Sequence, residues 1–154
     1  MSPPSDDIDR IMAVMASAFD PQFGEAWTRR QIEDALLLGN CFYGLVDEAG
    51  SRPAPGADAA GFSLSRYGFE EEELLLFAVD PHHRRKGLGR RMLDDLAAAA
   101  GKRGARRLLL EMRRGNPAES LYRAFGFQPI GERPDYYKMT SGERIDAVTF
   151  AYAV

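Results

Sequence analysis

A short basic turn over residues 84–91 is the part of the sequence whose residue types most directly indicate chemistry. Five of its eight residues are arginine or lysine, and Gly87 and Gly89 stand among them. A glycine turn that opens a helix presents unpaired backbone N–H groups, and the helix dipole adds about half a positive charge there. Because the formal net charge of the chain is −3, this turn is a local exception in an acidic protein. It predicts a site for the phosphates of a bound ligand.

Three phosphate-binding patterns can be compared with this turn. A P-loop needs four residues between its glycines, followed by lysine and then serine or threonine, and the turn has neither feature. A dinucleotide-binding turn needs a third glycine, and Met92 stands at that position here. Such a turn also follows the first strand of its domain, whereas this one lies in mid-chain. The third pattern is arginine or glutamine, two residues, glycine, one residue, then glycine or alanine, and Arg84 to Gly89 fit it throughout.

A strand before this turn and a helix after it must position it. Residues 74–79 form an apolar run that stops at Asp80, and residues 88–100 place their apolar side chains on one helical face. Residues 107–112 then predict a buried strand that carries Glu111 near its end. Two strands that flank one helix are expected to lie parallel, joined by a right-handed crossover.

The rest of the chain completes a mixed domain. The predicted helices span residues 8–19, 28–38, 88–100 and 116–125, and the predicted strands span residues 41–46, 61–67, 74–79, 107–112, 129–132 and 147–152. Residues 49–60 form the longest loop, and residues 135–137 form an aromatic loop between the last two strands. This order predicts an α/β (α+β) domain with one parallel crossover at its centre.

Length and composition bound the kind of protein. A chain of 154 residues is most simply one domain (residues 1–154), which buries about 68–70% of its unfolded surface. No apolar run approaches the roughly 20 residues that cross a bilayer, and the acidic start lacks the features of a signal peptide. Cys41 is the single cysteine, which favours the cytoplasm. With His82 and His83 as the two histidines, no metal site is expected.

In order along the chain, several short motifs match one enzyme family. From about Ile11 to the C-terminus the sequence resembles the GCN5-related N-acetyltransferases (GNAT), and within them the bacterial ribosomal-protein-alanine (RimI-type) group. The resemblance implies a mostly antiparallel central sheet with one parallel strand–helix–strand crossover and helices on both faces. The matching motifs are Glu25 to Thr28, Ala78 to Pro81, Arg84 to Gly89, Leu110 to Arg113, Asn116, Leu121 to Tyr122, Gly126 to Phe127 and Arg133 to Tyr137.

The resemblance implies that acetyl-CoA is the co-substrate and that no metal takes part. Backbone N–H groups of the basic turn would wrap its diphosphate, and the strand before the turn would pair with the pantetheine, with Asn116 contributing a further contact. A preorganised donor such as the Val79 N–H at the thioester oxygen can be worth about 3–4 kcal/mol. The implied cofactor-binding residues are Phe77, Ala78, Val79, Arg84, Arg85, Lys86, Gly87, Leu88, Gly89, Arg90 and Asn116.

The resemblance also implies two catalytic residues. Glu111 would act as general base on the acceptor amine, and Tyr122 would act as general acid toward the departing thiolate. Each has a structural alternative: Glu111 as a strand-end carboxylate paired with Arg106 or Arg113, and Tyr122 as a core tyrosine. Asn116 fits a helix cap equally well.

The segment from Asn116 to Tyr122 is one residue shorter than in the family pattern. If the loop absorbs the deletion, Tyr122 keeps its place. If the helix shifts instead, one residue rotates the side chains by about 100° and turns Tyr122 away.

The expected acceptor is an amine, most simply the N-terminal α-amine of a protein or peptide, whose pKa near 7.7–8.0 lies below the roughly 10.4 of lysine. Trp27, Tyr67, Tyr136 and Tyr137 are candidates for the walls of its groove, and the acidic residues 70–73 either attract it or are simply solvated. A small-molecule amine, a lysine, or a CoA-binding regulator without catalysis are the alternatives. Net charge argues against nucleic acid as a partner, no membrane partner is expected, and the chain is expected to be a monomer or homodimer.

Overall fold

The structure, a computed structural model, describes residues 5–154. Helices and strands alternate in the order that the sequence predicts, and α2 begins with the expected capping box between Thr28 and Gln31. The helices of the described residues are α1 (Ser5–Ala18), η1 (Pro21–Phe23), α2 (Arg29–Leu37), η2 (Pro81–His83), α3 (Leu88–Lys102) and α4 (Glu119–Phe125), where η marks a short 3-10 helix.

The strands form one six-stranded sheet in the order β1-β2-β3-β4-β6-β5. β3 and β4, which flank α3, pair parallel, and the other neighbours pair antiparallel. The predicted mixed sheet with one parallel crossover is therefore confirmed. The strands are β1 (Cys41–Val46), β2 (Gly61–Gly68), β3 (Glu71–Val79), β4 (Arg107–Arg113), β5 (Gln128–Lys138) and β6 (Arg144–Ala153).

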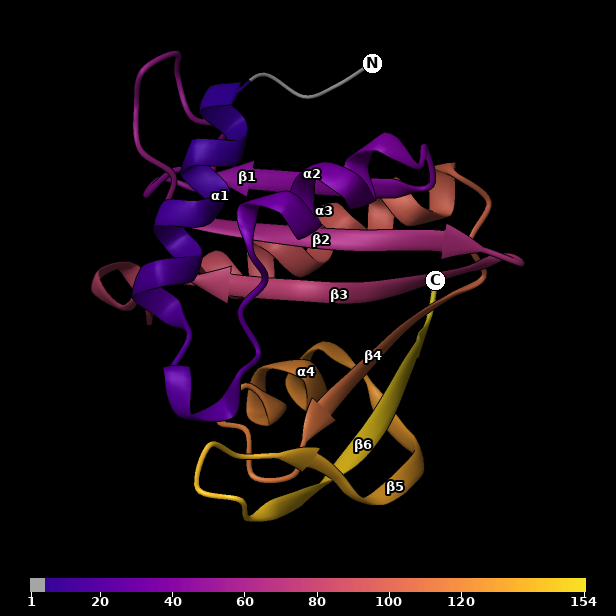
Figure 1. The fold of residues 1–154 in the computed structure, drawn as a ribbon. Helices are drawn as coiled ribbons and strands as arrows, with labels where there is room; N and C mark the ends of the chain where they lie inside the picture. Colours follow the sequence, from indigo (N-terminus) through magenta and orange to yellow (C-terminus); the bar gives the residue numbers. More distant parts are fainter. Residues whose placement is uncertain (1–4) are drawn as a thin grey trace.

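The sheet divides along the line between β3 and β4. The parallel pairing runs from Glu71 opposite Arg107 to Leu74 opposite Leu110 and ends there. Ser65 pairs with Leu74 while Leu64 pairs with Leu76, so Leu75 is an extra residue that bulges β3 at this point. Beyond the bulge β3 follows β2 and β4 follows β6, and the two halves of the sheet diverge (Figure 1).

Helices cover both faces of the sheet, as expected, and each face has its own hydrophobic cluster. α1 and α2 pack on one face against β1, β2 and the end of β3, with Ile11 and Phe62 fully buried. α3 and α4 pack on the other face against β4 and β6, around Leu108 and Phe150. In Figure 1, α1 and α2 lie in front of the sheet and α3 lies behind it.

The acidic residues at the start of β3 are paired with arginines, and Glu72 among them is buried rather than solvated. Each forms an ion pair with an arginine: Glu70 with Arg106, Glu71 with Arg107, Glu72 with Arg103, and Glu73 with Arg66. Glu72 is fully buried, and it accepts hydrogen bonds from both Ser65 and Arg103. Glu71 and Glu72 therefore connect β3 to β4 and to the C-terminal end of α3, whereas Glu73 pairs within the β2–β3 hairpin.

Two predicted boundaries near the C-terminus are wrong. α4 begins at Glu119 rather than at Asn116, because the Asn116 side chain first closes a turn by accepting the Ala118 N–H at 2.9 Å. Residues 135–137 belong to β5 rather than to a loop, since irregular pairing with β6 between Arg133 and Tyr137 accommodates Asp135 at φ 53°.

Candidate active site

The turn before α3 has the backbone conformation of an anion-binding nest. Arg85 and Gly87 both have positive φ, at 64° and 79°, and successive N–H groups in such turns converge on a common point. Gly87 is the N-cap of α3. Because no side chain accepts hydrogen bonds from the first turn of the helix, the N–H groups of that turn remain available. Gly89 also serves packing, since a Cβ there would lie 2.8 Å from Leu121 on α4.

The side chains of this turn differ in their exposure. Arg84, Arg85, Lys86 and Arg90 are exposed, whereas Leu88 is buried in the core, so that its backbone alone can serve a ligand. The Arg84 Nε donates to the Val79 carbonyl at 3.2 Å, which ties the turn back to the end of β3.

The end of β3 offers an unpaired strand edge toward the split in the sheet. The Asp80 N–H donates to the Ala60 carbonyl beside β2. Along an antiparallel strand, the N–H groups of successive residues point alternately toward and away from the neighbouring strand. Val79 and Phe77 therefore direct their N–H groups away from β2, and among residues 5–154 no strand pairs with them there. Ala78 differs from its neighbours, because its polar groups pair with Phe62 of β2 and its side chain is buried among α1 and α2.

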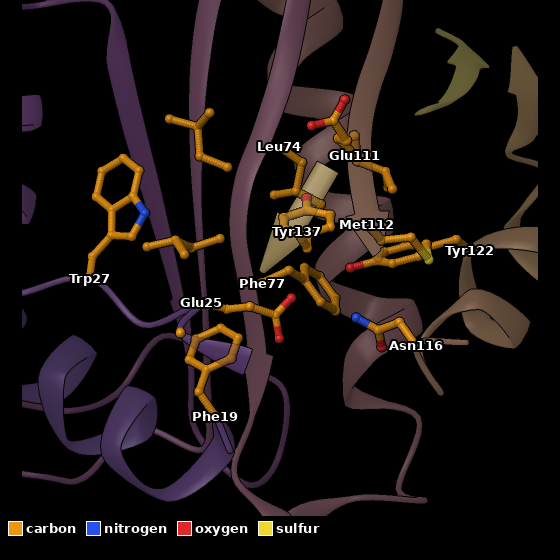
Figure 2. A pocket seen from close by; sticks show the side chains of 14 residues that line it. Phe19, Glu25, Trp27, Leu74, Phe77, Glu111, Met112, Asn116, Tyr122 and Tyr137 are labelled. Atoms are coloured by element: carbon orange, nitrogen blue, oxygen red, sulfur yellow. The ribbon is translucent and has the colours of Figure 1, made fainter. Parts of the chain in front are cut away.

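A cavity of about 300 Å³ lies where the two halves diverge. Its lining comes from the segment between α1 and α2, from β3, from β4, and from residues around α4 and β5. Figure 2 shows Tyr122, Tyr137, Asn116 and Glu25 directed toward its centre, with Phe77 among them. The structure thus brings Glu111, Tyr122, Asn116 and Phe77 of the sequence-predicted site into one cavity.

Glu111 reaches the cavity from β4, where it is held by the neighbouring strands. Its carboxylate accepts a hydrogen bond from the Thr149 hydroxyl of β6 at 3.3 Å, and it lies 3.5 Å from the Arg133 Nε of β5. The expected alternative partners are engaged elsewhere, Arg106 with Glu70 and Arg113 with Glu25. Glu111 therefore takes part in an ion pair between strands and also lines the cavity.

Tyr122 is buried but keeps its hydroxyl toward the cavity (Figure 2). Its ring makes edge-on contacts with Phe77 and Phe127, at 5.8 and 5.7 Å between centroids. Burial, reinforced by the charge of Glu25, raises the pKa of Tyr122 well above its ordinary value. Tyr122 thus faces the cavity, as expected if the loop rather than the helix absorbs the shortened segment.

Asn116 is not the N-cap of α4, which is Ala118, but it closes the preceding turn and lines the cavity. Its Oδ1 accepts the Ala118 N–H and closes the turn before α4. Its side chain also lines the cavity, and Figure 2 shows its amide nitrogen directed toward Tyr122 and Phe77.

Glu25 is a cavity residue whose chemistry the sequence did not reveal. It lies between η1 and α2 and lines the cavity opposite β4. Burial raises the pKa of its carboxyl above the ordinary value, while the charge of Arg113, 3.6 Å away, acts in the opposite sense. The sequence placed Glu25 in a family motif but assigned it no role, and its surroundings become visible only in the tertiary fold.

The aromatic candidates separate into two groups. Trp27 and Tyr137 line the cavity, and burial, followed by the charges of Glu111 and Glu25, raises the pKa of Tyr137 to about 12. Tyr136 is exposed and stacks edge-on with Tyr137, whereas Tyr67 packs on the α3 and α4 cluster away from the cavity.

Among residues 5–154, no three histidine, cysteine, aspartate or glutamate side chains gather as metal ligands do. No helix of the described chain has the length and apolarity that a membrane span requires.

Comparison with known proteins gives one consistent family. Residues 40–129 match the family model described as "Acetyltransferase (GNAT) domain". The ribosomal protein bS18-alanine N-acetyltransferase of Escherichia coli K12 is 38% identical over 96 residues, which cover 62% of this chain and 64% of that protein. A Bacillus subtilis relative is 30% identical over 133 residues, covering 86% of this chain and 82% of its own.

The fold agrees with these matches. The crystal structure of the E. coli ribosomal-protein-S18-alanine N-acetyltransferase superposes with a TM-score of 0.79 at 26% identity, covering 100% of this chain and 92% of that one.

Proposed function

The chain belongs to the acetyltransferase (GNAT) family, and from this membership we propose that it transfers the acetyl group of acetyl-CoA to the N-terminal α-amine of a protein. One observation carries the proposal. A nest at the start of α3, an unpaired strand edge and a cavity with a carboxylate and a tyrosine follow one another along the split between β3 and β4.

The geometry fits acetyl-CoA in two places. The nest at Arg85 and Gly87, with the exposed cations around it, suits a diphosphate. The N–H groups of Phe77 and Val79 suit a chain of amides lying along β3 as an added strand would. Acetyl-CoA would supply an activated thioester, and the Val79 N–H would stabilise negative charge on its oxygen.

Glu111 and Tyr122 are the proposed acid–base pair. An ammonium cannot attack a carbonyl, so a base must first take its proton, and Glu111, which lines the cavity, would be that base. The raised pKa of Tyr122 keeps its hydroxyl protonated through the neutral range, so the proton that the departing thiolate needs is present.

An N-terminal α-amine is the acceptor that asks least of this pair. Its ordinary pKa of about 7.7–8.0 lies some two units or more below that of lysine, so a carboxylate can deprotonate it more readily. Trp27 and Tyr137 would flank the acceptor chain in the cavity. Since the acceptor named for the E. coli relative is a ribosomal protein, we assign the activity to the cytoplasm.

An acceptor screen with purified protein tests the proposal. Release of CoA thiol is measured with a peptide that begins with alanine, with the same peptide blocked at its N-terminus but containing lysine, and with a polyamine. We expect the alanine peptide to react at least about tenfold faster, as the difference in amine pKa favours it. Equal rates on the lysine peptide or the polyamine would assign a different acceptor, and binding of acetyl-CoA without any turnover would indicate a regulator.

A further inference from the structure

We propose that Glu25 is a second proton-accepting carboxylate of the acetyl-transfer site, and that Arg113 is the residue that positions it. The inference rests on the proposed function and extends it to the wall of the cavity opposite Glu111.

The chain around Glu25 is fixed on both sides. Before it, the Asp20 side chain caps η1, and Gly24 at φ 61° returns its N–H to the Pro21 carbonyl. After it, the Trp27 N–H donates to the Met15 sulfur at 3.0 Å, and Thr28 begins α2. The carboxylate therefore projects into the cavity from a short, well-anchored segment, as Figure 2 shows.

Arg113 holds this carboxylate from β4. The Arg113 Nε lies 3.6 Å from Glu25, and the guanidinium stacks over Phe23 at 3.5 Å. The side chains of Arg113 and Glu25 are 13% and 23% exposed, so their charges interact through a poorly screened medium. The buried Arg113 Nε has no hydrogen-bond partner within the described chain, which leaves it free to bond Glu25 after a small movement.

The remaining charges and titratable groups around Glu25 come from three elements. They are Arg113 and Glu111 on β4, Tyr122 on α4, and Tyr137 and Arg133 on β5. The charge of Glu25 contributes to the raised pKa of both Tyr122 and Tyr137. The charge of Glu111 contributes to the raised pKa of Tyr137 but not to that of Tyr122. Glu25 is therefore the carboxylate that acts on the proposed general acid.

The proton balance of the reaction leaves a role for two carboxylates. An acceptor ammonium loses two protons as it becomes an amide N–H, while the C–N bond forms and the C–S bond breaks. The thiolate takes one proton from Tyr122. Tyr122 is then reprotonated by the second proton that the nitrogen releases. The other proton passes to solvent. Glu25 and Glu111 both line the cavity, so one of them can receive the first proton and release it to solvent, while the other receives the second proton and returns it to Tyr122.

Replacing each carboxylate by its amide tests the assignment. In acetylation of a peptide that begins with alanine, we expect Glu25→Gln and Glu111→Gln each to lower kcat about tenfold and the double variant about a hundredfold or more. Glu33→Gln, on the exposed face of α2, is the matched control. A Glu25→Gln enzyme within about twofold of wild type, or a double variant no slower than Glu111→Gln, would overturn the inference.

The role of Arg113 has a readout that packing alone would not move. Because the charge of Arg113 lowers the pKa of Glu25, Arg113→Met should raise it and shift the acid limb of kcat to higher pH in the Glu111→Gln background. Arg113→Lys should move the acid limb of kcat part of the way back toward its original pH. Arg30→Met, at an exposed position of α2, should not move it.

A carbon-13 titration of the Glu25 carboxyl, identified by its loss in Glu25→Gln, needs neither substrate nor turnover. We expect it above the ordinary glutamate value of about 4.3 in the wild type, and higher still in Arg113→Met. A wild type that acetylates no amine would refute the proposed function. An ordinary titration of Glu25 that Arg113→Met does not move would refute this inference even in an active enzyme.

Discussion

At the scale of single residues, the site combines side chains whose pKa values are shifted by their surroundings in the direction that acid–base chemistry would need. Burial keeps the Tyr122 hydroxyl protonated, and burial also raises the pKa of Glu25, so that this carboxylate holds a proton more readily than an exposed one. Groups whose pKa values are shifted toward their task cluster at functional sites. Here they share one cavity with Glu111 and Asn116.

Tyr122→Phe isolates the contribution of the hydroxyl. The phenyl ring preserves the edge-on contacts with Phe77 and Phe127, so the fold and acetyl-CoA affinity should be retained. We expect kcat to fall about a hundredfold, the usual size of a general-acid contribution. Steady-state kinetics and calorimetric binding of acetyl-CoA measure the two effects. Tyr152→Phe, which removes a hydroxyl from the same aromatic cluster outside the cavity lining, is the control, and equal kcat in both variants would contradict the assignment.

Most of the candidate site could be predicted because its residues stand in ordered motifs beside a glycine turn. The role of Glu25 could not, although the residue stands in a matching motif, since its surroundings depend on Arg113, a residue distant in sequence, and on burial in the tertiary fold. The environment of Glu111 was equally inaccessible, because Thr149 and Arg133 come from strands near the C-terminus.

At the scale of elements, α1 holds the longest loop of the chain through a buried network. Asp7 accepts hydrogen bonds from Arg10, Arg52 and Tyr43. Arg10 in turn donates to the carbonyls of Ala54 and Ala57, at 2.6 and 2.8 Å. The loop rich in glycine, proline and alanine is thus fastened to a helix by side chains rather than by secondary structure.

Asp7→Asn should destabilise the protein in a pH-dependent way. Burial alone would raise the pKa of Asp7, but hydrogen bonds from Tyr43, Arg52 and Arg10 together hold it below its ordinary value. A depressed carboxyl pKa stabilises the fold above the unfolded value of about 3.9, and that stability is lost as pH falls below it.

We expect Asp7→Asn to lower the free energy of unfolding by about 3 kcal/mol at pH 7, since it removes the buried carboxylate from Arg10 and leaves only the exposed Asp6 as its charge partner. Urea unfolding at pH 7 and at pH 3 should show the difference shrinking at the lower pH. A difference that stays constant between the two would contradict the assignment. Asp34→Asn, at an exposed pair with Arg30, should change little at either pH.

The element order followed from periodicity and turn residues, whereas strand details did not. The bulge at Leu75 lies within an unbroken apolar run from Leu74 to Val79, so nothing in the residue types marks it. The acidic start of β3 suggested solvent exposure, because the arginines that neutralise Glu71 and Glu72 lie more than thirty residues away. Side-chain pairs between distant elements are properties of the fold rather than of the local sequence.

At the scale of the whole molecule, the segment between α1 and α2 bridges the two halves of the sheet. η1 extends from the α1 side toward the β5–β6 turn (Figure 1), where the Thr140 N–H donates to the Gln22 carbonyl at 3.1 Å. Phe23 and Glu25 contact Arg113 on β4. The split in the sheet is therefore closed at one side by this segment.

Binding of acetyl-CoA along the split should stabilise the folded chain as a unit. At a hundred times its Kd, a ligand specific for the folded state adds about 2.7 kcal/mol, which corresponds to about 5–10 °C in Tm for a domain of this size. Differential scanning calorimetry with acetyl-CoA, and with adenosine as control, measures the shift. A Tm that does not change at millimolar acetyl-CoA would contradict the proposed binding site.

The extra residue at Leu75 bears on which kinds of mutation this site tolerates. Replacing Leu75 with another apolar residue keeps two residues of β3 opposite one of β2. Deleting it would restore one-to-one pairing, with Leu74 still opposite Ser65 and Leu76 still opposite Leu64, and would remove the local bend from β3. Without the bend, the parallel pairing with β4 could continue past Leu74, which would close the split that holds the cavity. The cavity thus depends on the length of β3, and a single-codon deletion threatens it more than a change of side chain at the same position.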